Sequence, residues 1–153
     1  MTQPMYPEPD RSPEVNAGRL WAGGIATAVV AALVVFVGVL IARGILDIPV
    51  LAPEGAGYLG DETTPVYAGL AALFALFSTA LLQMLLLATP RPVQFFTWIV
   101  GLMTAAGALI PFGRSAPLEA EVVTAAINLL VGLAVISLLS GVARTAVRQR
   151  QWS

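Results

Sequence analysis

The sequence predicts an all-α fold, a bundle of four transmembrane helices that run up and down in antiparallel order. Four long segments without any charged residue make up most of the 153 residues. Each is rich in Leu, Val, Ala, Ile and Phe, and each reaches the roughly 20 residues that a helix needs to cross a hydrocarbon core of about 30 Å. The uncharged segments are Leu20–Ala42, Thr63–Pro90, Pro92–Gly113 and Val122–Ala143.

The composition differs from that of a water-soluble domain. Charged residues are 11% of the chain and apolar residues 58%, whereas about a quarter of the residues in a soluble domain are charged. So few charges cannot cover so much apolar surface in water. We expect one transmembrane domain at residues 19–145. Its spans are predicted at about residues 20–43, 65–88, 93–112 and 121–143.

The first span is expected to stay in the protein and not to be cleaved as a secretory signal. Such signals begin with basic residues and have an apolar region of about 7–15 residues. Here the start is acidic and rich in proline, the apolar run is longer, and Arg43 follows it directly. Residues 1–18 are expected to form a disordered cytoplasmic tail because their Pro and polar content cannot bury a core. Residues 146–153 are expected to form a second cytoplasmic tail.

The connection at residues 44–64 is the longest, and two interpretations of it stay open. Its repeated Pro and Gly residues break helices, yet Ile45, Leu46 and Ile48 are apolar. It is either a connector whose apolar side chains dip into the lipid headgroups, or a lid or docking surface over the end of the bundle.

The two remaining connections are short. The turn Thr89–Pro92 makes the second and third spans antiparallel neighbours, and the turn Pro111–Pro117 leads to the fourth. Glu119 and Glu121 open that helix, where carboxylates favour the positive end of the helix dipole.

The distribution of arginine predicts the orientation, because positive residues in short connections mark the cytoplasmic side. With the amino terminus inside, the outer segments carry only Arg43 and Arg114. Both termini are therefore predicted to be cytoplasmic. The arginines of the inner segments are Arg11, Arg19, Arg91, Arg144, Arg148 and Arg150.

Small residues recur at helical spacing on the spans and predict the faces through which helices approach closely. Aromatic residues near the predicted boundaries are expected to anchor the bundle in the interface. The predicted packing residues are Gly24, Ala28, Ala32, Gly101, Ala105 and Gly132. The predicted aromatic anchors are Trp21, Trp152, Tyr58, Tyr67, Phe95, Phe96 and Trp98.

Four polar residues at depth are the candidate intramembrane contacts: Gln83, Asn128, Thr79 and Thr124. An amide in hydrocarbon needs partners. These residues either line a small polar cavity or form interhelical hydrogen bonds worth about 0.6–2 kcal/mol each. Gln83 is expected toward the inner side and Asn128 toward the outer side, so the two are not expected to touch.

The chain lacks the residues of most catalytic and metal sites. It has no cysteine and no histidine, which removes thiolates and the commonest general base and metal ligand. No charged residue lies deep in a span, where pumps and proton-coupled carriers need one. The net charge of −1 argues against nucleic acid as a partner. No catalytic residue, cofactor or metal is expected.

Four short stretches resemble an uncharacterised family of short actinobacterial membrane proteins that carry only a domain-of-unknown-function label. The resemblance implies four spans and the plasma membrane of an actinobacterium, and it supplies no activity and no catalytic residues. The stretches that carry it are Arg19–Gly24, Ala42–Pro53, Thr89–Pro92 and Leu138–Ala143.

Three functional hypotheses follow. The first is a non-enzymatic bundle that acts through protein or lipid contacts, as an accessory subunit or a small homo-oligomer. The second is a small transporter or channel component for a neutral or apolar solute, with the four polar residues as its contacts. The third is a membrane enzyme that acts on lipid, which would need to assemble Asp61, Glu62, Glu119 and Glu121.

Overall fold

The computed structural model describes residues 16–50 and 63–148, and within them it is all-α. Each of its four long helices is long and apolar enough to cross a membrane. This confirms the predicted four-helix fold and indicates a multi-pass membrane protein. The elements are α1 (Ala17–Gly44), α2 (Thr63–Ala88), α3 (Pro92–Leu109), the 3₁₀ turn η1 (Ile110–Gly113) and α4 (Leu118–Arg148).

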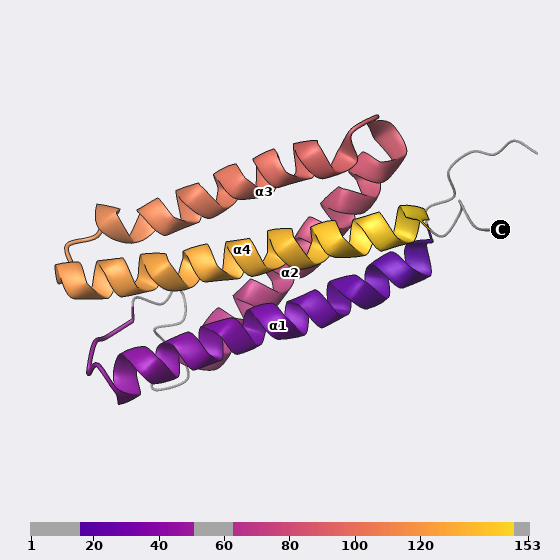
Figure 1. Ribbon diagram of the computed structural model, residues 1–153. Coiled ribbons are helices and arrows are strands. Elements are labelled where there is room, and N and C mark those ends of the chain that lie inside the picture. Colours follow the sequence, from indigo (N-terminus) through magenta and orange to yellow (C-terminus); the bar gives the residue numbers. More distant parts are fainter. Residues whose placement is uncertain (1–15, 51–62, 149–153) are drawn as a thin grey trace, which may run out of the picture.

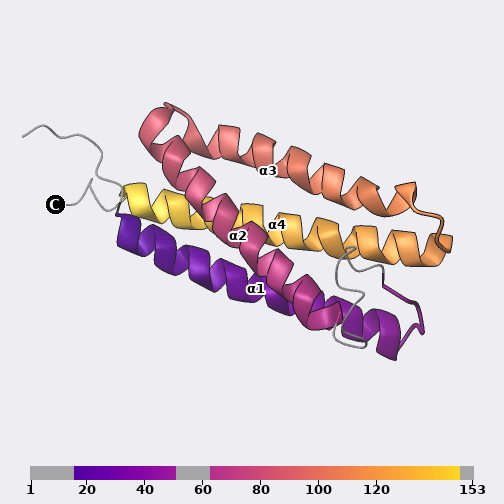
Figure 2. The same ribbon diagram turned by 180° about the vertical axis from the view of Figure 1, so that it is seen from behind.

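Three helices form a layer and the fourth crosses it. In Figure 1, α4 lies between α1 and α3. Behind them, α2 runs diagonally from the carboxyl-terminal half of α1 to the amino-terminal end of α3. Figure 2 shows the same crossing from the other side. We call the end of the bundle with Ala17, the 89–91 turn and Arg148 the terminal end. The opposite end is the loop end.

Glycines fix the antiparallel register of α1 and α4. A Cβ atom built on Gly23 would lie 2.6 Å from Val142, and one built on Gly38 would lie 2.9 Å from Ile127. As the α1 residue number rises from 23 to 38, that of its α4 partner falls from 142 to 127. The helices therefore run in opposite directions and approach too closely for a side chain at either glycine.

Close contacts at glycines also join α1 to α2 and α3 to α4. A Cβ on Gly24 would lie 2.5 Å from the Thr79 Oγ1, which joins α1 to α2, and one on Gly132 would lie 2.7 Å from the Thr104 Cβ, which joins α3 to α4. Ala28 is buried and Ala32 half-buried on the same side of α1 as Gly24.

The contact face of α3 differs from the predicted one. Nothing lies within 4 Å of a Cβ built on Gly101, and Ala105 is exposed. Both residues therefore lie away from the helix contacts in the structure. The buried face of α3 consists of Phe96, Val100, Thr104 and Ala108.

The helix ends follow local chemistry. Both α1 and α4 extend slightly beyond the predicted spans at each end, whereas α3 ends at Leu109 and η1 continues it to Gly113. The Asn16 side chain accepts a hydrogen bond from the Arg19 backbone N–H at 3.2 Å, a helix cap that starts α1 at Ala17, so residues 17 and 18 are helical and not part of a tail. At the other end α4 continues to Arg148, beyond the predicted end of the fourth span. The rest of the two predicted tails lies outside the described residues.

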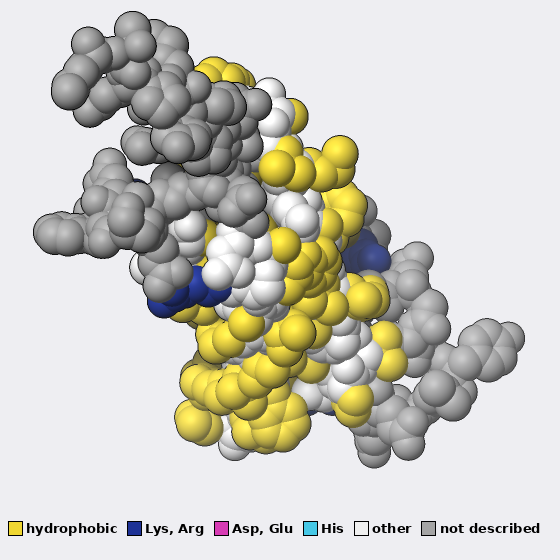
Figure 3. All heavy atoms as spheres, turned by 90° about the vertical axis from the view of Figure 1, so that its right-hand side faces the viewer, with side chains coloured by type: hydrophobic (Ala, Val, Ile, Leu, Met, Phe, Trp, Pro, Cys, Tyr) yellow, Lys and Arg dark blue, Asp and Glu magenta, His cyan; other side chains and the backbone are white. Residues whose placement is uncertain are grey.

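The surface carries large apolar side chains on every helix. Phe77, Trp98 and Leu133 are about 60% exposed, at 58%, 66% and 60%. Figure 3, a view from the terminal end, shows hydrophobic side chains spread over the described surface with arginine at its margin. An apolar surface of this extent is suited to lipid and not to water.

The connection after α1 is described only in part. Asp47 has a φ of 57°, a left-handed conformation that Asp adopts more readily than most residues, and the Ile48 N–H donates to the Ala42 carbonyl at 2.8 Å. Ile45 is 76% exposed, whereas Val50 is buried. The choice between lid and connector for residues 44–64 stays open, because residues 51–62 lie outside the described part of the chain.

Candidate functional site

A crevice of about 650 Å³ lies between α2, α3 and α4 in the loop-end half of the bundle. Its size falls within the range of roughly 300–1,000 Å³ that is typical of small-molecule sites. Most of the lining is apolar. The lining residues are Tyr67, Leu70, Ala71, Phe74, Met103, Thr104, Ala106, Gly107, Ile110, Pro111, Arg114, Thr124, Asn128 and Val131.

The crevice results from the divergence of α2 and α3. The short 89–91 turn holds these helices together at the terminal end, and they separate toward the loop end (Figure 2). Two small residues, Ala71 on α2 and Gly107 on α3, line the space between these helices. Nothing lies within 4 Å of a Cβ built on Gly107, so the space beside it is open.

Each helix contributes one face to the lining. Residues 67, 70, 71 and 74 of α2 share a face, as do 103 and 107 of α3 with 110 of η1, and 124, 128 and 131 of α4. These spacings of three and four residues place side chains above one another on a helix.

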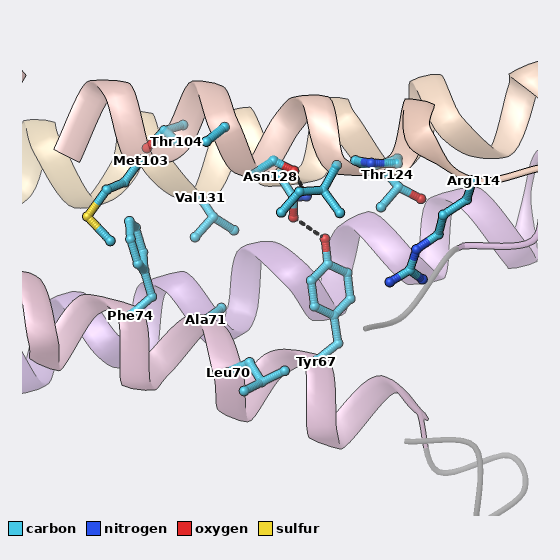
Figure 4. A pocket seen from close by; sticks show the side chains of 14 residues that line it. Tyr67, Leu70, Ala71, Phe74, Met103, Thr104, Arg114, Thr124, Asn128 and Val131 are labelled. Atoms are coloured by element: carbon cyan, nitrogen blue, oxygen red, sulfur yellow. Dashed lines mark hydrogen bonds between the residues drawn. The ribbon is translucent and has the colours of Figure 1, made fainter. Parts of the chain in front are cut away.

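A hydrogen-bonded group ties the three helices together inside the crevice. The Tyr67 hydroxyl of α2 donates to the Asn128 Oδ1 of α4, as the dashed line in Figure 4 marks. The Asn128 Nδ2 donates to the Gly107 carbonyl oxygen of α3 at 2.9 Å. Asn128 therefore uses both ends of its amide, one for each neighbouring helix.

Proline explains why the Gly107 carbonyl needs this partner. In an α-helix this oxygen would accept from the N–H four residues later, and that residue is Pro111, which has no N–H. The helix tightens into η1 at this point. Neighbouring helices commonly supply the missing donor inside membranes, and here Asn128 does so.

The two threonines of the lining donate to their own helices. The Thr104 Oγ1 donates to the Val100 carbonyl and the Thr124 Oγ1 to the Ala120 carbonyl, each at 2.7 Å. Such bonds to the preceding turn are common for threonine in helices. They let hydroxyl groups lie in apolar surroundings.

Arg114 is the one charged residue among the residues that line the crevice. It follows η1 at the loop end and is half-buried. In Figure 4 its side chain extends toward the space beside Tyr67, while Phe74 and Met103 lie at the opposite end of the crevice. The crevice is therefore cationic at one end and apolar at the other.

The predicted polar contacts lie at two levels of the bundle. Asn128 and Thr124 line the crevice, whereas Thr79 packs against Gly24 and donates to the Ala75 carbonyl at 2.8 Å. The Gln83 Oε1 accepts from the Trp21 Nε1 at 2.6 Å. This is an interhelical bond between α1 and α2, although Trp21 was predicted as an interfacial anchor and not as this partner. The structure therefore does not gather the four residues into one site.

Two of the aromatic assignments change. Tyr67 is only 7% exposed and points into the crevice, so it is not an interfacial anchor. Phe96 is fully buried in the core, while its neighbours Phe95 and Trp98 are exposed. The sequence signal for the hydrogen bonds of Asn128 was the Gly107–Pro111 spacing, because Pro111 leaves the Gly107 carbonyl in need of a donor from another helix.

The acidic residues considered for an enzyme are only partly described. Glu119 is exposed and Glu121 buried in the first turn of α4, and Asp61 and Glu62 lie outside the described residues. Within the described part of the chain, no cluster of three or more acidic or other ligating side chains could hold a metal ion.

The sequence match decides the family. The model of a family of unknown function, DUF6069, matches residues 15–145. The chain belongs to this family. The DUF6069 match includes every residue of the crevice lining and confirms that the resemblance to an uncharacterised family was sound. No curated protein matches the chain, and no solved structure matches it.

Proposed function

We propose that this DUF6069 protein is a non-enzymatic, multi-pass protein of the plasma membrane that acts through lipid contacts, by holding an apolar or amphipathic molecule in the crevice between α2, α3 and α4. The observation that carries the proposal is the crevice itself, a space of about 650 Å³ with mostly apolar walls and a few convergent polar groups. Sites for small ligands have this composition.

The crevice opens sideways, toward the surface that lipid covers. Leu70, Met103 and Ile110 line it and are also 43%, 41% and 61% exposed. A molecule in the bilayer can therefore enter between α2 and α3 without crossing water. This entrance favours a lipid-like occupant over a solute that arrives from the aqueous phase.

The polar groups of the crevice support a binding role and not a catalytic one. Asn128 and Tyr67 are engaged in hydrogen bonds that join helices, and the Thr104 hydroxyl donates within α3. The whole chain has no cysteine or histidine, so it offers neither a thiolate nucleophile nor an imidazole base. A second role as a transporter finds no favouring observation, because Gln83 and Thr79 are engaged with α1.

Arginine supports the orientation within this proposal. Arg19, Arg91 and Arg144 lie at the terminal end, and Arg43 and Arg114 at the loop end. Positive residues favour the cytoplasmic side, so both termini face the cytoplasm and the crevice lies in the outer half of the membrane. The exposed apolar helix faces could also contact other membrane proteins, as in an accessory subunit or a small homo-oligomer.

Two matched glycine variants test the binding role. Native mass spectrometry of the full chain, released from lipid nanodiscs, measures how many lipid molecules stay bound. Gly107→Leu fills the crevice and should abolish retention. Gly101→Leu adds the same side chain to the same helix, also where nothing lies within 4 Å, and should leave retention unchanged. Equal retention by both variants would refute binding in the crevice.

A further inference from the structure

We infer that the occupant of the crevice is an anionic lipid, with its acidic headgroup at Arg114 and an acyl chain against Leu70, Phe74 and Met103. This inference rests on the proposed function and names the ligand class of the same site. Three observations carry it: the single charge in the lining, the polarity along the crevice, and its depth in the bundle.

The positive charge of Arg114 favours a negatively charged headgroup. Arg114 is the one ionisable cation of the lining, and no acidic residue is part of it. A guanidinium offers five N–H donors, so it can bind a phosphate while it serves another acceptor. Arginine binds phosphate with two parallel hydrogen bonds, which is the contact that a phospholipid headgroup would make.

The polarity of the crevice matches that of an amphipathic molecule. Arg114 lies at one end, Tyr67 and Asn128 lie in the middle, and Phe74 and Met103 lie at the other end (Figure 4). A lipid placed with its headgroup at Arg114 sets its glycerol region near the polar pair and its chain against the apolar end. Methionine is flexible enough to adapt to a chain of variable shape.

The depth of the crevice matches one leaflet. Its lining on α2 runs from Tyr67 to Phe74, about 10 Å along a helix that rises 1.5 Å per residue. A hydrocarbon core is about 30 Å thick, so the apolar part of the crevice stays within the leaflet at the loop end. Arg114 follows the last turn of η1, at the level expected for headgroups.

The test uses the full chain in nanodiscs of phosphatidylcholine with a minor fraction of phosphatidylglycerol. Native mass spectrometry then compares the ratio of the two retained lipids with their ratio in the disc. Wild-type protein should retain phosphatidylglycerol about tenfold above its share, the order expected for one charge-assisted contact. Arg114→Gln should lose this enrichment, and Arg114→Lys should keep part of it.

Arg43→Gln is the matched control, because it removes a cation at the same end of the bundle outside the crevice lining. It should leave the enrichment unchanged. Wild-type protein without enrichment would overturn the inference even if Arg114→Gln failed to fold. Equal loss in Arg43→Gln and Arg114→Gln would also overturn it, because the preference would then come from general surface charge.

The outcomes separate this inference from the proposed function. If Gly107→Leu abolishes retention but Arg114→Gln keeps the preference for phosphatidylglycerol, the crevice binds lipid and only the headgroup assignment is wrong. If Gly107→Leu retains lipid as the wild type does, the proposed function fails as well. Loss of enrichment in Arg114→Gln together with loss of retention in Gly107→Leu supports both.

Discussion

The Asn128 side chain replaces the backbone donor that Pro111 removes, by donating to the Gly107 carbonyl oxygen at 2.9 Å. One residue of α4 thereby completes the hydrogen bonding of α3, and its other amide atom accepts from Tyr67 of α2. An unsatisfied carbonyl in hydrocarbon is costly. The Asn128 amide therefore completes the hydrogen bonding at the end of α3 and also forms part of the crevice wall. The stability of the bundle and the shape of the crevice depend on this one amide.

The bond between Asn128 and Gly107 predicts a coupling with Pro111. Asn128→Leu should lower the free energy of unfolding by about 1–2 kcal/mol, because it leaves the carbonyl and the Tyr67 hydroxyl without partners. The loss should shrink in a Pro111→Ala background, where the new backbone N–H at position 111 can donate to the Gly107 carbonyl. The free energies of unfolding of the wild type, the two single variants and the double variant form a double-mutant cycle. They can be measured by SDS-induced unfolding in mixed micelles, followed by circular dichroism. Strictly additive losses would contradict this role for Asn128.

The contact between Gly132 and Thr104 predicts a sharp size limit. Gly132→Ala should destabilise the bundle by about 1–3 kcal/mol through overpacking, because the added Cβ would lie 2.7 Å from the Thr104 Cβ. Gly101→Ala on α3 meets nothing within 4 Å and should be neutral or stabilising by up to about 1 kcal/mol, since Ala favours helix over Gly. Thermal unfolding in detergent compares the stabilities of the two variants. A similar loss of stability in both would show that the close approach of Gly132 to Thr104 does not limit the residue size at position 132.

The Trp21–Gln83 bond predicts a rescue near the terminal end. Trp21→Phe removes the indole N–H that donates to the Gln83 Oε1 at 2.6 Å and should cost about 0.6–1.7 kcal/mol. Combining it with Gln83→Leu should recover much of this loss, because an apolar pair leaves no polar group unpaired. Midpoints of SDS-induced unfolding give the comparison. A double variant less stable than Trp21→Phe would rule out the bond as the cause.

The absence of cysteine from the sequence allows a direct test of orientation. Ser115→Cys places a thiol at the exposed turn of the loop end, and Thr145→Cys places one near the terminal end, where Thr145 is exposed. A membrane-impermeant maleimide should label the first in intact cells and the second only after permeabilisation. The reverse pattern would invert the assignment of both termini.

The sequence was sufficient for the helices and insufficient for their contacts. A segment that crosses the bilayer must satisfy its backbone polar groups internally, as a helix does. The predicted spans 20–43, 65–88 and 121–143 lie inside α1, α2 and α4, whereas 93–112 runs from α3 into η1. Which face of a helix meets a neighbour is less constrained. On α3, both the Gly101–Ala105 stripe and the Thr104–Ala108 stripe offer small residues, and the structure buries the second.

The crevice could not be predicted, because it depends on the diagonal path of α2. Asn128 was identified as a polar residue at depth, but nothing in the sequence paired it with Tyr67, a residue 61 positions away. Arg114 was read only as one of two outer arginines. Pro111, four residues after Gly107, was the local signal that a donor from another helix was needed at this depth.

The most direct test of lipid binding is an experimental structure of the full chain in nanodiscs that contain phosphatidylglycerol. We expect elongated density between Leu70 of α2 and Met103 of α3, with its headgroup end at Arg114 and the Asn128–Gly107 bond intact. A structure in which α2 and α3 close over this space, with no room for an acyl chain beside Gly107, would rule out lipid binding in the crevice.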